Sequence, residues 1–351
     1  MKKLIYTAFF SCLTLAVMAQ DKHFTQFYAA PLTLNPALTG TFDGRYRFST
    51  IYRDQWRKVL DNPYQTFAAG LDLRFPVAGA VRSPYDDAAG VGLLFFTDVV
   101  PSVEFRTTQI ALSGAFHKAL NTESNQYLSV GFQFGITQRS IGYSNLTFND
   151  QFDGTTGYTD ATGEDLPQNN FAFGDMSVGL NYSYAPRRGV AFFAGVALHH
   201  VLEPQVSFYF DDENPEDSGD NKLFRQYSAQ FTAQLPIADG ITISPRAIAA
   251  LQGPHLEINA GTNFRFQLGE DSPAALHLGS WVRPVTTDNS SFELDAVILM
   301  VGFEMNNVLL GLSYDATLND LNASRQGQGA FEISVAYLGN YENEAILCPK
   351  F

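Results

Sequence analysis

The chain has 351 residues, a formal net charge of −14 and two cysteines. Charged residues make up only 17% of it and aromatic residues 14%, with 30 phenylalanines and 16 tyrosines. The acidity argues against nucleic-acid binding, which needs a basic surface. Beyond the N-terminus no run of 18 apolar residues occurs, so the sequence excludes a helical membrane protein.

Residues 1–19 have the pattern of a secretory signal peptide. Two lysines precede an apolar run at 4–17, and a small-x-small motif at 17–19 offers a cleavage site. We therefore expect an exported chain that starts at residue 20. Its single remaining cysteine, Cys348, cannot form an internal disulfide, and its role stays open.

Residues 20–43 form a second predicted region, which is not a strand. The region has two prolines and several aromatic residues but no apolar–polar alternation. The Asn35-Pro36 pair keeps the chain extended at position 35, and Gly40 suits a tight turn. We expect this apolar segment to act like a plug that packs at the periplasmic mouth of a barrel or against a partner; the alternative is a disordered leader.

Residues 44–340 alternate between apolar and small or polar side chains. The stretch 128–138, LSVGFQFGITQ, is the clearest example, because its leucine, valine, phenylalanines and isoleucine all fall on one face of a strand. A transmembrane β-barrel needs this pattern, with hydrocarbon outside and a polar lumen inside. The sequence therefore predicts an all-β fold, a transmembrane antiparallel barrel of about 14 strands.

The alternation divides the region into fourteen predicted strands, an even number as in bacterial single-chain barrels. Their ranges are 44–53, 64–75, 88–98, 103–118, 125–139, 175–185, 189–202, 222–235, 240–251, 255–268, 273–283, 291–305, 307–317 and 329–339. A short tail, 341–351, follows the last strand.

The predicted connections alternate between short and long. Short ones include 186–188, 236–239, 269–272 and 306, and long ones include 140–174, 203–221, 284–290 and 318–328; the exception is 76–87, which is long on the short side. Outer-membrane barrels have short turns in the periplasm and long loops outside. We therefore expect both termini in the periplasm of a Gram-negative cell. Aromatic residues near the strand ends fit membrane interfaces.

Several motifs, taken together, resemble one known family. Near the N-terminus they are Gln26-Phe27-Tyr28, Pro31, Leu34-Asn35-Pro36-Ala37, Thr39-Gly40 and Tyr52-Arg53-Asp54-Gln55-Trp56. Later ones are Asp150-Gln151-Phe152, Gly195-Val196 with His199-His200 and Pro204, Gly311-Leu312-Ser313-Tyr314-Asp315 with Leu321, Phe331-Glu332-Ile333-Ser334 and Cys348-Pro349-Lys350-Phe351. The chain resembles the PorP/SprF family of Bacteroidetes outer-membrane proteins, associated with type IX secretion and gliding. It departs from the family where Phe331 precedes Glu332 and a histidine is more usual.

The resemblance implies a non-enzymatic barrel that works with other type IX secretion components. One role in the family is a partner that helps to secrete and anchor an adhesin with a type B C-terminal domain. The alternative role is a core component linked to the periplasmic motor. We favour the adhesin partner, whose cargo the sequence does not identify. The residues that we expect to contact partners are Asn35, Pro36, Trp56, Asp150, Gln151, Phe152, His199, His200, Asp211 and Asp212.

The residues alone bear on three other functions. An enzyme is disfavoured, since no Gly-x-Ser-x-Gly or His-Glu-x-x-His motif occurs and the adjacent residues His199 and His200 would point to opposite faces of a strand. Calcium binding at the acidic outer loops stays open, although neither acidic run has full calcium-loop spacing. A passive porin stays open too, because the predicted inward face has few charges, and whether the lumen is open or plugged is undecided.

Overall fold

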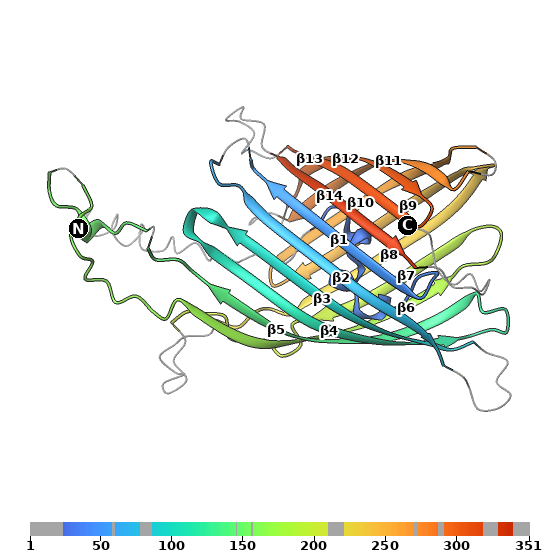
Figure 1. Ribbon diagram of the computed structural model, residues 1–351, viewed down its shortest axis with the longest axis horizontal. Coiled ribbons are helices and arrows are strands. Elements are labelled where there is room, and N and C mark those ends of the chain that lie inside the picture. Colours follow the sequence, from blue (N-terminus) through green and yellow to red (C-terminus); the bar gives the residue numbers. More distant parts are fainter. Residues whose placement is uncertain are drawn as a thin grey trace.

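The computed structural model describes residues 24–57, 60–77, 86–144, 146–155, 157–209, 221–269, 272–286, 291–318 and 329–339. Within these ranges fourteen antiparallel strands close into one barrel, in which β1 pairs with both β2 and β14 (Figure 1). The strands are β1 (Tyr46–Gln55), β2 (Tyr64–Pro76), β3 (Ala88–Val100), β4 (Phe105–Ala119), β5 (Gln126–Ser140), β6 (Asn170–Tyr184), β7 (Ala191–His199), β8 (Gln226–Ala238), β9 (Ile241–Gln252), β10 (His255–Gln267), β11 (Ala274–Thr286), β12 (Phe292–Met305), β13 (Val308–Thr317) and β14 (Gly329–Leu338). The predicted fold class and strand number are confirmed. The predicted signal peptide and C-terminal tail lie outside the described residues.

The predicted faces of the strands are also confirmed. In β5 the side chains of Leu128, Phe132 and Ile136 are 47%, 54% and 60% exposed, whereas that of Gln133 is 5% exposed. Because consecutive side chains of a strand point to opposite sides, the exposed apolar set covers the outside of the barrel. Among the described residues, no helix is long and apolar enough to span a membrane.

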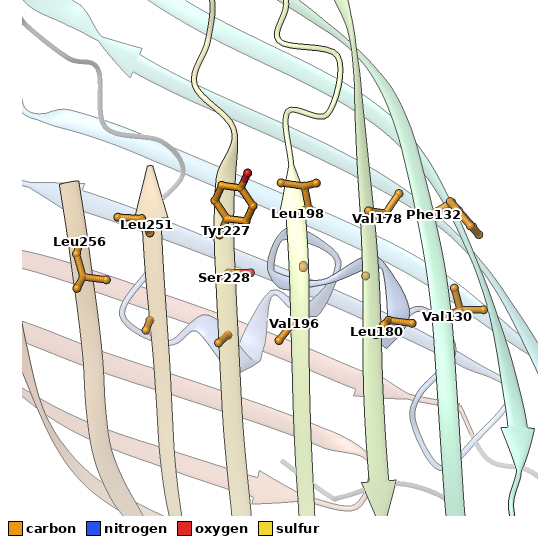
Figure 2. Close-up of a pocket in the computed structure, with 14 residues that line it drawn as sticks. Val130, Phe132, Val178, Leu180, Val196, Leu198, Tyr227, Ser228, Leu251 and Leu256 are labelled. Atoms are coloured by element: carbon orange, nitrogen blue, oxygen red, sulfur yellow. The ribbon is translucent and has the colours of Figure 1, made fainter. Parts of the chain in front are cut away.

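The outer wall is apolar and contains a shallow hollow over β5–β10 (Figure 2). The hollow measures about 680 Å³, and its rim includes the outward side chains of Leu180, Val196 and Tyr227. The small side chains of Ala229 on β8 and Ala249 on β9 also line the hollow. An apolar outer surface of this kind suits contact with lipid chains.

The connections have a long-loop end and a short-turn end. The long-loop end carries residues 141–169 and 200–225, and the short-turn end carries 239–240 and 306–307. Two tight connections interrupt the expected alternation at the long-loop end. One is the helix η3 (Pro101–Val103), and the other is the turn at Gly253, where φ is 54°.

Strand ends differ from the predicted ones around the two longest loops. β6 already begins at Asn170 rather than at 175, and β7 ends at His199 rather than at 202. β8 begins at Gln226 rather than at 222. Side-chain alternation alone does not mark these ends, because they depend on which residues find a pairing partner in the neighbouring strand.

The described residues that precede β1 form a plug inside the barrel, defined here as residues 24–43 (Figure 1). The plug contains the short helices η1 (Phe27–Ala29), α2 (Pro31–Leu34) and η2 (Pro36–Leu38). Its first residues contact the long-loop halves of β1, β13 and β14, and its last residues contact the short-turn ends of β2–β4. The plug thus meets the short-turn mouth, where packing was expected, and also extends beyond it through the lumen.

The main apolar core of the described chain lies between the plug and the inner wall. Its buried members are Phe24, Phe27, Tyr28, Ala29, Ala30, Ile51, Ala68, Phe96, Trp281, Ala296, Ile298 and Met300. The plug reaches so deep because it is too apolar to remain in water and finds apolar inward side chains to cover. The predicted inward face of small polar residues is therefore incomplete, because it omits these large apolar side chains.

Candidate functional site

A buried carboxylate holds the first residues of the plug. The backbone N–H groups of Thr25 and Gln26 donate to Glu332 Oε1 and Oε2 over 2.8 and 2.9 Å. The side-chain amide of Gln26 donates to Ser313 Oγ, and its oxygen accepts from Ser334. Both oxygens of one β14 carboxylate are thus used to fix the plug backbone.

Two arginines neutralise the charge around this contact. Arg53 Nη1 lies 2.7 Å from Glu332 Oε1 and 3.0 Å from Asp315 Oδ2, and Arg283 Nη2 lies 2.7 Å from the same Asp315 oxygen. The Thr25 hydroxyl donates to Asp315 over 2.7 Å and accepts from Arg283. All four charged side chains are at most 4% exposed. Burying a charge is costly unless it is paired and hydrogen-bonded, and each of these four charges has an oppositely charged partner.

The middle of the plug lies against strands that carry glycines at the contact. The Asn35 side-chain amide donates to the carbonyls of Leu180 and Val196, on β6 and β7, over 3.1 and 3.3 Å. A Cβ on Gly179 would lie 1.9 Å from Asn35 Oδ1, and one on Gly131 would lie 2.3 Å from Ala37 N. Only glycine allows the plug backbone to approach the wall this closely.

A second buried ion pair fixes the end of the plug. The Arg47 guanidinium donates to both oxygens of Asp72 over 3.0 and 2.7 Å, in the bidentate geometry that favours arginine–carboxylate pairs. Arg47 also donates to the Leu38 carbonyl, and the N–H of Gly40 donates to Asp72 over 2.7 Å. Gly40 has a φ of 75°, which glycine adopts at no steric cost.

The two adjacent histidines both lie in the lumen, which corrects the expectation that they point to opposite faces. Strand β7 ends at His199, and His200 adopts a left-handed backbone with a φ of 57°. His199 contacts Ser177 Oγ at 3.1 Å and the plug carbonyl of Leu34 at 3.3 Å, whereas His200 contacts Asp175 at 2.7 Å. The serine and the aspartate therefore contact different histidines.

Tyr28 of η1 has a different environment from the ionic contacts. Its ring is stacked on Trp281 with centroids 6.0 Å apart, and the Arg246 guanidinium lies 3.9 Å from its centroid on another side. Burial raises the pKa of the Tyr28 phenol against the opposing effect of Arg246, so the phenol stays neutral.

At the long-loop end, the described part of 141–169 is folded by its own hydrogen bonds. Gln151 closes the helix η4 (Asn149–Gln151) by accepting from the N–H of Phe148, and Asp150 accepts from Gly163 and Thr162. Phe152, 48% exposed, packs against an equally exposed Tyr158 with ring centroids 5.4 Å apart. Two aromatic rings are thus held at the surface by an ordered loop.

The remaining predicted contact residues lie apart from these groups. Trp56 follows β1 and packs edge-on against Tyr64, with centroids 5.1 Å apart. Asp211 and Asp212 lie outside the described residues. Within the described ranges no group of three or more histidine, cysteine or acidic side chains is placed to hold a metal ion.

Comparison with known proteins decides the family. The family model described as "Type IX secretion system membrane protein PorP/SprF" matches residues 16–337. The chain belongs to the PorP/SprF family. A search of curated protein sequences finds no match.

Solved structures share the fold of this PorP/SprF protein. The structure titled "CymD monoaromatic hydrocarbon channel" is 12% identical, with a TM-score of 0.51 over 90% of this chain and 94% of that one. The structure titled "TodX monoaromatic hydrocarbon channel deltaS2 mutant" is 10% identical, with a TM-score of 0.50 over the same shares. A FadL homologue from Pseudomonas aeruginosa is 11% identical, with a TM-score of 0.45 over 86% of this chain and 92% of that one. Together with the family, the fold identifies an outer-membrane barrel.

The structure brings together motifs that are far apart in the PorP/SprF sequence. Gln26, Arg53, Asp315 and Glu332 come from four separate motifs and meet in one buried cluster. Of the predicted contact residues, Asn35 and His199 meet at the β6–β7 wall, while Phe152 lies in an outer loop. The family motifs contain the residues of this cluster, but their spacing in the sequence does not show which of them contact one another.

Proposed function

We propose that this PorP/SprF protein is a non-enzymatic partner of a secreted adhesin that carries a type B C-terminal domain. In this role it helps to secrete the adhesin and anchors it at the cell surface. The observation that carries the proposal is the plug, which is bonded to the wall from the cluster at Glu332 to the ion pair at Asp72. A lumen filled in this way favours work at the outer surface over passive diffusion through the barrel.

The exposed aromatic pair in 141–169 is the docking surface that we favour. Phe152 and Tyr158 are about half exposed, although large apolar side chains outside the lipid-facing wall gain from being covered. Buried aromatic anchors carry much of the binding energy in protein interfaces. The hydrogen bonds of Asp150 and Gln151 hold the loop in one shape, which lowers the entropic cost of binding.

The test compares surface display of the adhesin in two variants. Phe152→Ser combined with Tyr158→Ser should leave the barrel assembled but release the adhesin into the medium, with surface levels falling roughly tenfold. The control Ile237→Ser removes a similarly exposed apolar side chain near the short-turn end of β8 and should leave display unchanged. Immunofluorescence on intact cells and blots of the medium measure both.

Each other outcome points to a different role. Normal display in the double variant would reject the aromatic pair as the docking surface. If deletion of the gene blocks secretion of many cargoes, the core-component role linked to the motor replaces the adhesin role. If deletion spares every adhesin but abolishes uptake of one small solute, the porin role replaces it.

An engineered disulfide between the plug and the wall tests whether the plug must move for the protein to work. The hydroxyl oxygens of Thr39 and Ser113 lie 3.0 Å apart, so cysteines at both positions come within reach of a disulfide. In a Cys348→Ser background, Thr39→Cys with Ser113→Cys should display the adhesin as the parent does, under both oxidising and reducing conditions. Loss of display on oxidation alone would show that the plug must move, and would contradict a role confined to the outer surface.

A further inference from the structure

A partly open cavity lies inside the barrel, between the plug and the wall. It measures about 90 Å³, and its lining includes Phe27 of the plug, Arg47 of β1 and, on β6–β9, Asn181, Phe193, Gln230 and Arg246. A site needs roughly 10–15 Å³ of such volume for each water molecule, so this cavity has room for several waters or for one small ligand.

Arg246 brings an uncompensated charge to this cavity. The side chain is 3% exposed, and its Nε and Nη1 atoms have no hydrogen-bond acceptor. Its neighbour is the neutral ring of Tyr28, 3.9 Å away, and no carboxylate among the described residues pairs with it. Three other buried arginines of the lumen, Arg47, Arg53 and Arg283, contact carboxylates, whereas Arg74 donates to the Gly40 carbonyl. A buried guanidinium without an anion is costly, and a cation–π contact compensates only part of that cost.

An unsatisfied amide, that of Asn181 on β6, also lines the cavity. Both the Oδ1 and Nδ2 atoms of Asn181 are buried without a partner. A Cβ built on Gly195 would lie 2.9 Å from Asn181 Oδ1, from Gln230 Nε2 and from Asn35 Nδ2 of the plug. The amides of Asn181 and Gln230 therefore converge at Gly195 beside the plug, and either amide can turn its N–H₂ group toward a ligand.

We propose that this cavity binds a small monovalent anion of the size of a halide or acetate. The Arg246 guanidinium supplies the opposite charge, and the amides of Asn181 and Gln230 supply further donors. The volume of about 90 Å³ matches a small anion, and the rings of Phe27 and Phe193 form an apolar part of the lining. The bound anion would join plug and wall, because its cavity is built from both. The inference does not depend on the proposed role in adhesin anchoring.

The test measures thermal unfolding of the purified full chain in detergent with gluconate as the bulk anion, which is too large for the cavity. Titration with bromide or acetate should raise the unfolding midpoint by roughly 2–5 °C and then saturate. Bromide should also give an anomalous diffraction peak beside the Arg246 guanidinium. The two anions distinguish a halide site from a carboxylate site.

Three variants make the test specific. Arg246→Met keeps the side-chain length but removes the charge, and should abolish both the shift and the peak. Asn181→Leu keeps the shape and the arginine, and should weaken the apparent affinity about tenfold; it serves in place of Arg246→Met if that variant does not fold. Arg188→Met changes an exposed turn arginine and should behave as the parent does. Three results would each overturn the site. The first is an unfolding midpoint that rises linearly with anion concentration and does not saturate. The second is a midpoint shift in the Arg246 and Asn181 variants as large as in the parent, and the third is a bromide peak elsewhere.

Discussion

At the scale of single residues, the close contact between plug and wall depends on glycines, which have no side chain. Gly131, Gly179 and Gly195 lie on three consecutive strands, and each lets an atom of residues 35–37 occupy the place of a Cβ. An alternating strand pattern shows such glycines only as small inward residues. Their role becomes visible once the plug is placed beside them.

Gly131→Ala should therefore loosen the plug. Its Cβ would lie 2.3 Å from the backbone of Ala37 and of Pro36, which cannot rotate away as a side chain would. Overpacking of this kind costs about 1–3 kcal/mol. The expected result is a lower midpoint in denaturant unfolding and faster proteolysis of the plug in the purified protein.

Gly174→Ala is the matched control for this substitution. It lies on the outer face of β6, and its Cβ would meet the Phe134 ring at an ordinary 3.5 Å. The control should unfold and resist protease as the parent does. Equal effects of the two alanines would mean that the wall tolerates the plug at a greater distance than the structure shows.

At the scale of elements, the alternation of side chains predicted the strands of the wall but not which inward side chains contact the plug. The outward positions of β5 follow directly from period-two patterning, because lipid-facing residues must all be apolar. Inward positions follow no such rule here, since each one matches whatever part of the plug it touches. Trp281, Arg53 and Glu332 all point inward, yet one is aromatic, one is positively charged and one is negatively charged.

The end of β7 shows a second limit of patterning. The sequence predicts that His199 and His200 point to opposite sides, which holds only while the strand continues. The strand stops, and the left-handed backbone at His200 turns its ring toward Asp175. Such stops depend on tertiary contacts and not on local propensity.

Glu332→Gln should release the plug from β14. The substitution removes the charge that pairs with Arg53 and weakens two backbone hydrogen bonds to the plug. Breaking a buried ion pair by changing one partner costs about 3–5 kcal/mol. The expected result is frequent open events in planar-bilayer recordings, where the parent protein conducts little.

Glu304→Gln controls for the loss of any lumen carboxylate. Glu304 pairs with Arg265 and His277, which are both wall residues. This variant should lower the unfolding midpoint without opening the lumen. If both variants conducted equally, the contact at Glu332 would have no special part in closing the barrel.

At the scale of the whole molecule, the family and the fold were both recognisable in the sequence, whereas the filled lumen was not. The fourteen strands could be counted in the sequence because each one places apolar side chains at alternate, outward-facing positions. A plug was predicted, but its attachment deep in the lumen was not, because Thr25 and Glu332 are separated by 307 positions and no periodicity links them.

Labelling of intact cells should establish which end of the barrel faces outward. A small peptide tag in 141–169 should bind antibody without permeabilisation, because long loops of outer-membrane barrels face the exterior. A tag in the turn 186–190 should bind only after permeabilisation. The reverse pattern would invert the barrel and place the aromatic pair in the periplasm.

The path of the plug through the lumen constrains how the protein assembles. Residue 25 is bonded to β14, the last strand, and β14 closes the wall by pairing with β1, the first. Contacts so distant along the chain form late, because loop closure must precede them. The hydrogen bonds from Thr25 and Gln26 to Glu332 can therefore form only once β14 is in place. Closure of the cylinder by β14 thus also supplies the side chain that fixes the start of the plug, so one strand completes both the wall and the attachment of its contents.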